Sequence, residues 1–256
     1  MNFMYQNLLF LFIVSLGINL VMFLVAYKYQ TDKLTDASYS ITFIALSSWI
    51  FFQLSSRNVT DTIIYALIFI WAIRLGYYLF KRIQVTGRDD RFDEIRTSFK
   101  SFLGFWLVQG VSVFIILLSQ FIISQNNNDK ISELIVIGIM ISIIGFLIES
   151  VADHQKFTFK LNNPNDFIST GLWQKIRHPN YLGEILFWLG IFVASIPYSS
   201  LTYIAIALIS PLWISFLLIK FSGIPPLEEK WMTKYKDNTD FQEYYKRTSR
   251  LIPGVY

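Results

Sequence analysis

The sequence predicts an all-α polytopic membrane protein, a bundle of about seven transmembrane helices. Charged residues make up 16% of the chain, whereas a soluble domain has about 25%. The apolar residues are gathered into runs close to the ~20 residues that a membrane-spanning helix needs. No segment shows the strict apolar–polar alternation of a half-buried strand. We therefore expect one integral-membrane domain over residues 1–256.

Seven runs qualify as spans in chain order, and each has its own character. The first is uncharged and lacks the basic start and cleavage site of a signal peptide, which indicates a retained span. The second is the weakest, because it contains several hydroxyl side chains and Gln53. The third contains Arg74, although an arginine at the bilayer centre costs at least ~2.5–3.5 kcal/mol. The predicted spans are about 6–27, 38–55, 61–81, 101–123, 131–150, 180–197 and 200–220.

The basic residues predict the orientation of these spans. Lys and Arg gather after the first, third and fifth spans and in the C-terminal tail. The opposite side has only Arg57 and Lys130. Because basic loops stay in the cytoplasm, we expect an outside N-terminus, a cytosolic C-terminus and an odd number of spans.

Composition also excludes several kinds of chemistry. The chain has no cysteine, which excludes disulfides, thiolate catalysis and Cys-ligated metals. With only His154 and His178, a histidine-rich metal site is not expected, and we predict no metal. The net charge of +4 comes from residues beside the spans, where orientation and contact with anionic membrane lipids explain it. We do not expect nucleic-acid binding.

Polar residues on the sixth predicted span form the first candidate site. Asn180, Glu184 and Trp188 follow one another at four-residue spacing and so share one helix face. Arg177 and His178 precede them, and a positive cluster at a helix start suits a phosphate or carboxylate ligand. The structural alternative is that Pro179 starts the helix, Asn180 caps it and Tyr181 lies in the aromatic belt. That alternative leaves Glu184 and Trp188 unexplained.

Two further polar faces point to the same end of the bundle. Glu149, Asp153, Lys156 and Lys160 share a face where the fifth span ends, and the alternative is a solvated helix with acid–Lys pairs worth only ~0.3–0.5 kcal/mol each. The third span carries one face with Arg74, where the alternative is anchoring at the membrane interface. The residues on that face are Trp71, Arg74, Tyr78 and Arg82. We expect these faces to converge on a cavity at the cytosolic side.

These motifs resemble those of the steroid 5-alpha-reductase superfamily, and in particular its bacterial branch of multi-pass membrane proteins. The quoted residues are the run 177–184 with Trp188, Glu149 followed by the run 153–156, the pair Arg74-Leu75 with Trp71, and the ending Leu251-Ile252-Pro253. The resemblance covers about residues 60–256, with the cofactor motifs in the C-terminal half from about residue 100. His-Pro-x-Tyr alone is shared with the isoprenylcysteine carboxyl methyltransferases.

The resemblance implies an NADPH-dependent reductase in a bacterial inner membrane, with its cofactor site facing the cytosol. It would reduce a carbon–carbon double bond beside a carbonyl in a lipid or steroid-like substrate. Carried over to this chain, the cofactor-lining residues would be Asp153, Lys160, Arg177, His178, Asn180, Tyr181, Glu184, Trp188 and Tyr244. Arg74, Tyr78 and Arg88 would approach the phosphates and the adenosine part. No GxGxxG motif follows a strand, so the expected dinucleotide site is not of the Rossmann type.

The sequence departs from the characterised steroid reductases where the substrate carbonyl would be polarised. The second span has Gln53 but no acid, and Trp71 stands where the family has a tyrosine. Gln53 and Tyr78 are therefore the candidate catalytic residues.

Two other hypotheses stay open. One is an S-adenosylmethionine-dependent lipid methyltransferase, suggested by His-Pro-Asn-Tyr and by Glu228-Glu229 in the tail; we interpret these two acids instead as part of a solvated amphipathic helix. The other is a non-catalytic lipid-binding membrane protein.

Overall fold

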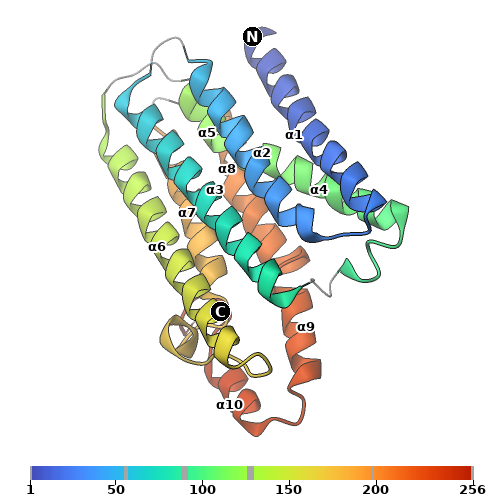
Figure 1. Cartoon of the computed structure of the whole chain (residues 1–256). Helices are drawn as coiled ribbons and strands as arrows, with labels where there is room; N and C mark the ends of the chain where they lie inside the picture. The colour runs from blue at the N-terminus through green and yellow to red at the C-terminus, as the bar shows by residue number, and fades with distance from the viewer. Residues whose placement is uncertain (1, 55–56, 88–91, 126–129, 198, 255–256) are drawn as a thin grey trace. The chain divides into compact units, whose positions relative to one another are not determined.

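A computed structural model describes residues 2–54, 57–87, 92–125, 130–197 and 199–254 of the chain (Figure 1). The described residues form helices joined by short loops, and their β pairing is an isolated parallel bridge between Ile176 and Ser249. The helices are α1 (Asn2–Lys28), α2 (Lys33–Phe52), α3 (Val59–Thr86), α4 (Phe99–Ile116), α5 (Leu118–Ser124), α6 (Glu133–Asn162), α7 (Pro179–Ser195), α8 (Leu201–Phe216), α9 (Ile224–Lys234) and α10 (Thr239–Arg247). Short helical stretches at Gly171–Gln174 and Leu217–Phe221 complete the described fold.

Five helical segments are long and apolar enough to cross a membrane. They are Met4–Lys28, Val59–Val85, Phe99–Ser124, Glu133–Asn162 and Leu201–Lys234. They correspond to the first, third, fourth, fifth and seventh predicted spans, which confirms the prediction of an all-helical integral membrane protein in contact with membrane lipids. The regions of the second and sixth predicted spans are helical, as α2 and α7, but neither helix is among these five segments. α2 carries Lys33 and Asp36 beside many hydroxyl side chains, and α7 has only 17 residues.

The helix ends differ from the predicted spans where polar residues continue a helix. The fifth span was predicted to end near residue 150, but α6 continues to Asn162. It therefore carries Glu149, Asp153, Lys156 and Lys160 on one uninterrupted helix. The predicted fourth span is divided at Leu117 between α4 and α5. Pro179 starts α7, as predicted, because its fixed φ suits the first turn and its missing N–H needs no partner there.

The chain divides into two compact units. Unit 1 comprises Met1–Ile135 and Ser195–Ser210, and unit 2 comprises Val136–Ala194 and Pro211–Tyr256. Unit 1 thus holds α1 to α5 with the first part of α8. Unit 2 holds most of α6, nearly all of α7, the rest of α8, and the tail helices α9 and α10.

In unit 1, buried polar side chains join α1, α2 and α4. The Nε2 of Gln109 donates to the Oδ1 of Asn19 at 2.9 Å, and the hydroxyl of Ser38 donates to the same oxygen at 3.1 Å. The hydroxyl of Ser15 donates to the carbonyl of Gly110 at 2.7 Å. Hydrogen bonds of this kind hold transmembrane helices together where no water competes for the donors.

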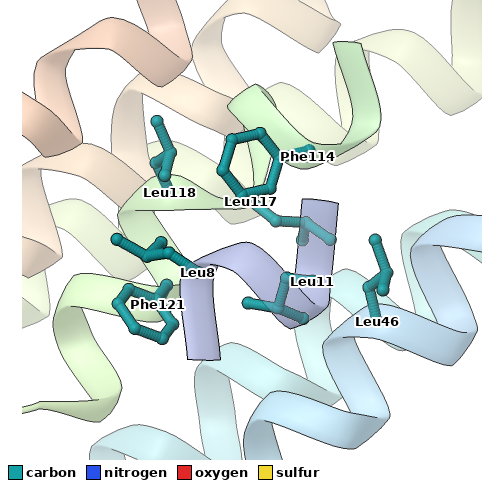
Figure 2. A pocket seen from close by; sticks show the side chains of 7 residues that line it. All are labelled: Leu8, Leu11, Leu46, Phe114, Leu117, Leu118 and Phe121. Atoms are coloured by element: carbon teal, nitrogen blue, oxygen red, sulfur yellow. The ribbon is translucent and has the colours of Figure 1, made fainter. Parts of the chain in front are cut away.

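Unit 1 also contains a small apolar pocket. Figure 2 shows its lining, which is made only of leucine and phenylalanine side chains. These are Leu8, Leu11, Leu46, Phe114, Leu117, Leu118 and Phe121. The lining has no polar group that would orient a ligand, so this pocket is a packing feature of the apolar bundle.

In unit 2, α6 and α7 pack backbone against backbone (Figure 1). A Cβ atom added to Gly138 would lie 2.5 Å from the backbone nitrogen of Ala194, and one added to Gly183 would lie 2.5 Å from that of Glu149. The hydroxyl of Ser142 donates to the carbonyl of Phe187 at 3.0 Å. Small residues at both helix surfaces permit this approach, as is common where membrane helices associate. The approach brings the polar face of α6 directly against the start of α7.

Candidate functional site

The polar faces predicted on α6 and α7 meet within unit 2. The amide nitrogen of Asn180 donates to a carboxylate oxygen of Asp153 at 3.2 Å. One turn later on α7 and one turn earlier on α6, the backbone of Gly183 lies against the backbone of Glu149. Glu149 and Asp153 are buried, at 2% and 3% exposure. The expected pairing of these two faces is therefore present.

Asn180 is left with an unused acceptor. Its amide nitrogen bonds to Asp153, whereas its Oδ1 is buried and has no hydrogen-bond partner among the described residues. The amide nitrogen, which donates, is the atom that faces the carboxyl group of Asp153, so the oxygen is the atom left over. A buried carbonyl oxygen without a donor costs free energy that a ligand N–H would recover.

Glu184 and Trp188 continue this face of α7. Glu184 lies one turn beyond Asn180 and is half-buried, and Trp188 lies one turn further and is fully buried. The ring of Trp188 packs edge-to-face with Phe187, with ring centroids 5.2 Å apart. The face thus changes along the helix from an amide to a carboxylate and then to a buried indole.

A small open pocket lies in the same unit. Lys156 and Lys160 come from α6, Phe167 and Ile168 come from the loop after it, and the other lining residues come from the tail. The ammonium group of Lys156 lies 4.9 Å from the ring centroid of Trp173 and 5.6 Å from that of Trp231. The lining residues are Lys156, Lys160, Phe167, Ile168, Trp231, Tyr235, Phe241 and Tyr244. The ammonium group of Lys160 donates to the backbone carbonyls of Pro164 and Asp166. A lining of lysines and aromatic rings suits a ligand that is both anionic and planar.

Tyr244 acts in this pocket as a neutral hydrogen-bond donor. Its hydroxyl donates to the backbone carbonyl of Trp173 at 2.9 Å. Burial raises the pKa of Tyr244 to about 12, because the phenolate would lose its hydration. Burial, together with the charge of Asp166, also raises the pKa of Tyr235. Neither tyrosine is therefore a general base at neutral pH.

Arg177 and His178 are held by the tail. The Nε of Arg177 donates to Glu228 at 2.9 Å, and the Nε2 of His178 lies 3.3 Å from the same carboxylate oxygen. Arg177 also donates to the backbone carbonyls of Tyr245, at 2.9 Å, and of Thr248. Glu228 is only 5% exposed, so our interpretation of this acid as part of a solvated tail helix is wrong. Hydropathy along α9 could not show it, because Glu228 is buried by residues far away in the sequence.

The imidazole of His178 lies between two aromatic rings. It is stacked on Trp231 with ring centroids 5.2 Å apart and on Tyr181 at 5.5 Å, and both ring pairs are nearly parallel. Burial lowers the pKa of His178, and the hydrogen bond and charge of Glu228 offset part of that shift. The side chain is thus a buried neutral imidazole near pH 7. Tyr181, predicted to line the cofactor, serves here as a stacking partner.

A family model matches residues 22–248, which is most of the chain. Its description reads "Protein of unknown function (DUF1295)". The chain belongs to the DUF1295 family. A comparison with curated proteins finds no matching sequence. The matched range includes the residues of unit 2 described above, up to position 248.

The structure of this DUF1295 protein brings together some of the predicted site residues. Asp153 and Asn180 share a hydrogen bond, and Glu184 and Trp188 extend the same face. Lys160 and Tyr244 line the pocket. Lys156 also lines it, and it lies one turn after Asp153 on α6. Arg177, His178 and Tyr181 form a neighbouring cluster with Glu228 and Trp231. These residues all belong to unit 2.

The other predicted residues of the DUF1295 chain belong to unit 1 or lie outside the described part. Gln53 and Tyr78 are not brought together. α2 and α3 run antiparallel, since Ser48 contacts Tyr65 and Ser40 contacts Gly76, close to Tyr78. Gln53 follows Ser40 by 13 positions, which is about 20 Å along a helix. Arg74 is half-buried on α3, and Arg88 lies outside the described residues.

Sequence reasoning missed the aromatic wall of the pocket. Phe167 comes from the loop after α6, Trp231 from α9, and Phe241 from α10. The rings of Phe167 and Phe241 pack edge-to-face at 5.2 Å. The tail did offer a signal, because α10 carries its aromatic residues on one side and its charges on the other. That pattern predicts a buried face without saying what covers it.

Proposed function

We propose that this protein is a membrane-embedded, NADPH-dependent reductase of a carbon–carbon double bond in a lipid or steroid-like substrate. The observation that supports this most is the pocket of unit 2, which Lys156 and Lys160 line together with aromatic rings. Asp153, which pairs with Asn180, lies one turn before Lys156 on α6. A dinucleotide combines several phosphate charges with two planar rings. Lysine side chains suit the phosphates, and aromatic side chains suit the rings.

The residues present fit this cofactor in charge and in hydrogen bonding. The Oδ1 of Asn180, buried and without a partner, would accept an N–H of the nicotinamide carboxamide. Lys156 and Lys160 would neutralise phosphate oxygens. The pocket's eight lining residues would contact one end of the dinucleotide. The remainder would extend along the polar face toward Glu184.

The charges also favour NADPH over S-adenosylmethionine. The reactive sulfonium of S-adenosylmethionine is a cation, and two lysines beside it would oppose its binding. In addition, both carboxylate oxygens of Glu228, the acid that suggested a methyltransferase, are already occupied. Its Oε1 accepts from Arg177, and its Oε2 accepts from Tyr245 at 3.1 Å. The tail acid is therefore a poor candidate for contact with a methyl donor.

When bound, NADPH supplies a hydride to the double bond of the substrate. The chain would orient the nicotinamide through Asn180 and keep the site dry through Trp188, which is fully buried. A carbonyl beside the double bond would need a hydrogen-bond donor as negative charge develops on its oxygen. Gln53 and Tyr78 cannot supply this donor together, because Gln53 lies about 20 Å along α2 from Ser40, the residue that contacts α3 close to Tyr78.

The proposed topology places this chemistry at the cytosolic face of a bacterial inner membrane. α2 and α7 would complete a set of seven spans, with the N-terminus outside and the C-terminus in the cytosol. Basic residues of the tail and of the segment after α6 support this orientation through the positive-inside rule. NADPH is a cytosolic metabolite too polar to cross the membrane, so its site would face that side.

Thermal unfolding of the detergent-purified protein with different ligands tests the proposal. NADPH at about 100 times its dissociation constant should add about 2.7 kcal/mol of apparent stability, and S-adenosylmethionine should add none. Stabilisation by S-adenosylmethionine alone would favour a methyltransferase, and stabilisation by neither would favour a non-catalytic lipid binder. Both results would overturn the proposal.

A pair of lysine variants makes the same experiment specific to the pocket. Lys156→Gln/Lys160→Gln removes two cations from the lining, and Lys175→Gln/Lys246→Gln removes two cations from exposed positions of the same unit. The NADPH-induced stabilisation should be lost in the first variant and kept in the second. Equal losses in both would show that only the net charge matters.

A further inference from the structure

The carboxylate of Glu228 joins three separate segments of unit 2. Arg177 Nε donates to it at 2.9 Å, His178 Nε2 lies at 3.3 Å, Tyr245 Oη donates at 3.1 Å, and Arg250 Nη2 lies at 3.0 Å. These partners come from the loop before α7, from α10 and from the segment after α10. Both carboxylate oxygens are used, and the side chain is 6% exposed.

Backbone hydrogen bonds run beside this carboxylate and join the same segments. The N–H of Arg177 donates to the carbonyl of Ser249 at 2.9 Å, and the N–H of His178 donates to that of Arg250 at 3.1 Å. The N–H of Ser249 donates back to Lys175 at 3.2 Å. We call this set of contacts, from residues 175–178 through Glu228 to residues 245–250, the tail clamp.

The tail clamp holds the elements that supply half of the lining of the proposed pocket. Four of its lining side chains, Trp231, Tyr235, Phe241 and Tyr244, come from α9 and α10, and the others come from α6 and the following loop. The clamp holds α9 through Glu228 and the end of α10 through Tyr245 and Thr248. Residues 175–178 of the clamp directly precede Pro179, where α7 begins. α7 in turn carries Asn180.

We propose that Glu228 is a positioning residue for the nucleotide pocket: by clamping the C-terminal tail to the start of α7, it assembles the aromatic wall that the ligand would stack on. This inference rests on the proposed function for the identity of the ligand. Arg177 and His178 thereby act on the ligand through the tail, and not by direct contact as the sequence suggested. Removing the charge of Glu228 leaves Arg177, which is 6% exposed, as a buried cation without its counterion.

Adjacent carboxylates provide a matched pair of variants. Glu228→Gln keeps the shape of the side chain but removes its charge, and Glu229→Gln makes the same change at an exposed neighbour. Tyr245→Phe is milder, because it deletes only the hydroxyl that donates to Glu228 and keeps the ring that lies 4.1 Å from the Arg177 guanidinium carbon. Glu228→Asp tests whether a shorter carboxylate restores the clamp.

The rate of trypsin cleavage in the tail of the full-length, detergent-purified protein measures how firmly the clamp holds the tail. This experiment needs no ligand. Lys230, Lys234 and Lys236 are exposed cleavage sites in and after α9. Cleavage there should be at least tenfold faster in Glu228→Gln than in the wild type, unchanged in Glu229→Gln, and intermediate in Tyr245→Phe and Glu228→Asp. Equal cleavage rates in Glu228→Gln and Glu229→Gln would overturn the clamp, whether or not the protein binds NADPH.

NADPH then tests the positioning role itself. The NADPH dissociation constant should rise at least tenfold in Glu228→Gln and stay unchanged in Glu229→Gln. NADPH at 100 times its dissociation constant should slow tail cleavage of Tyr245→Phe by up to about 100-fold, because only the clamped tail binds. A tail clamp of purely structural importance would leave cleavage independent of NADPH, which would overturn the positioning role. If the wild type itself binds no NADPH, the proposed function fails, and the cleavage rates alone decide the clamp.

Discussion

At the scale of single residues, the environment of a side chain assigns its role more precisely than its type does. The sequence predicted that Arg177 and His178 bind a cofactor directly, because basic groups before a helix suit anions. The structure gives both a buried partner in Glu228. The positions of Asp153 and Asn180 on the polar faces of their helices could be predicted, because the face that a residue occupies depends only on its spacing from neighbours in the same helix. The partnership with Glu228 spans about 50 positions, and no local pattern encodes it.

The protonation of His178 gives a prediction at this scale. Burial lowers its pKa below the ordinary value of 6.5, despite the opposing effect of Glu228 and with the help of Arg177 and Lys156. As the pH falls below about 6.5, the unfolded chain binds a proton that the folded chain does not. The free energy of unfolding should therefore fall with decreasing pH until the folded-state pKa is passed.

Thermal unfolding between pH 7.5 and pH 5.5 measures this effect. The chain has two histidines, so His154→Gln at an exposed position is the natural control for His178→Gln. The loss of stability on acidification should be smaller in His178→Gln than in His154→Gln. Identical pH dependence in the two variants would show that His178 is not the titrating group.

At the scale of elements, hydropathy locates the helices but not their ends. The apolar runs predicted the positions of the membrane helices, because burial in lipid requires an apolar surface along the whole span. α6 continues beyond its apolar run to Asn162, since helix formation requires only backbone hydrogen bonds and tolerates polar side chains. The glycines of α6 and α7 have the same seven-residue spacing, at 138 and 145 and at 183 and 190. Spacing alone does not show that the two pairs face each other.

The close packing of α6 on α7 predicts the effect of a single methyl group. In Gly138→Ala the new Cβ would lie 2.5 Å from the backbone nitrogen of Ala194, which has no freedom to move away. Overpacking of this kind costs about 1–3 kcal/mol. At Gly104 of α4 an added Cβ meets nothing within 4 Å, so Gly104→Ala should be neutral or stabilising by up to ~1 kcal/mol. Thermal unfolding in detergent compares them, and equal stability of the two variants would contradict the described helix contact.

At the scale of the whole molecule, the proposed topology makes a prediction about membrane sides. Three predicted spans, including the short α7, separate Lys130 from Lys246, so the two positions should lie on opposite sides of the membrane. The chain has no cysteine of its own, which makes single-cysteine labelling unambiguous. A membrane-impermeant thiol reagent should label Lys130→Cys in intact bacterial cells and Lys246→Cys only after the membrane is opened. Labelling of both in intact cells would show that α7 does not cross.

Equilibrium titration with NADPH tests the central claim most directly. The fluorescence of the reduced nicotinamide should report saturable binding to the wild-type protein, competed by NADP⁺ and unaffected by S-adenosylmethionine. Loss of the two pocket lysines in Lys156→Gln/Lys160→Gln should weaken binding at least tenfold, or about 1.4 kcal/mol, and the exposed pair Lys175→Gln/Lys246→Gln should bind as the wild type does. Absence of saturable NADPH binding to the folded wild-type protein, or equal affinity of the two double variants, would contradict the account.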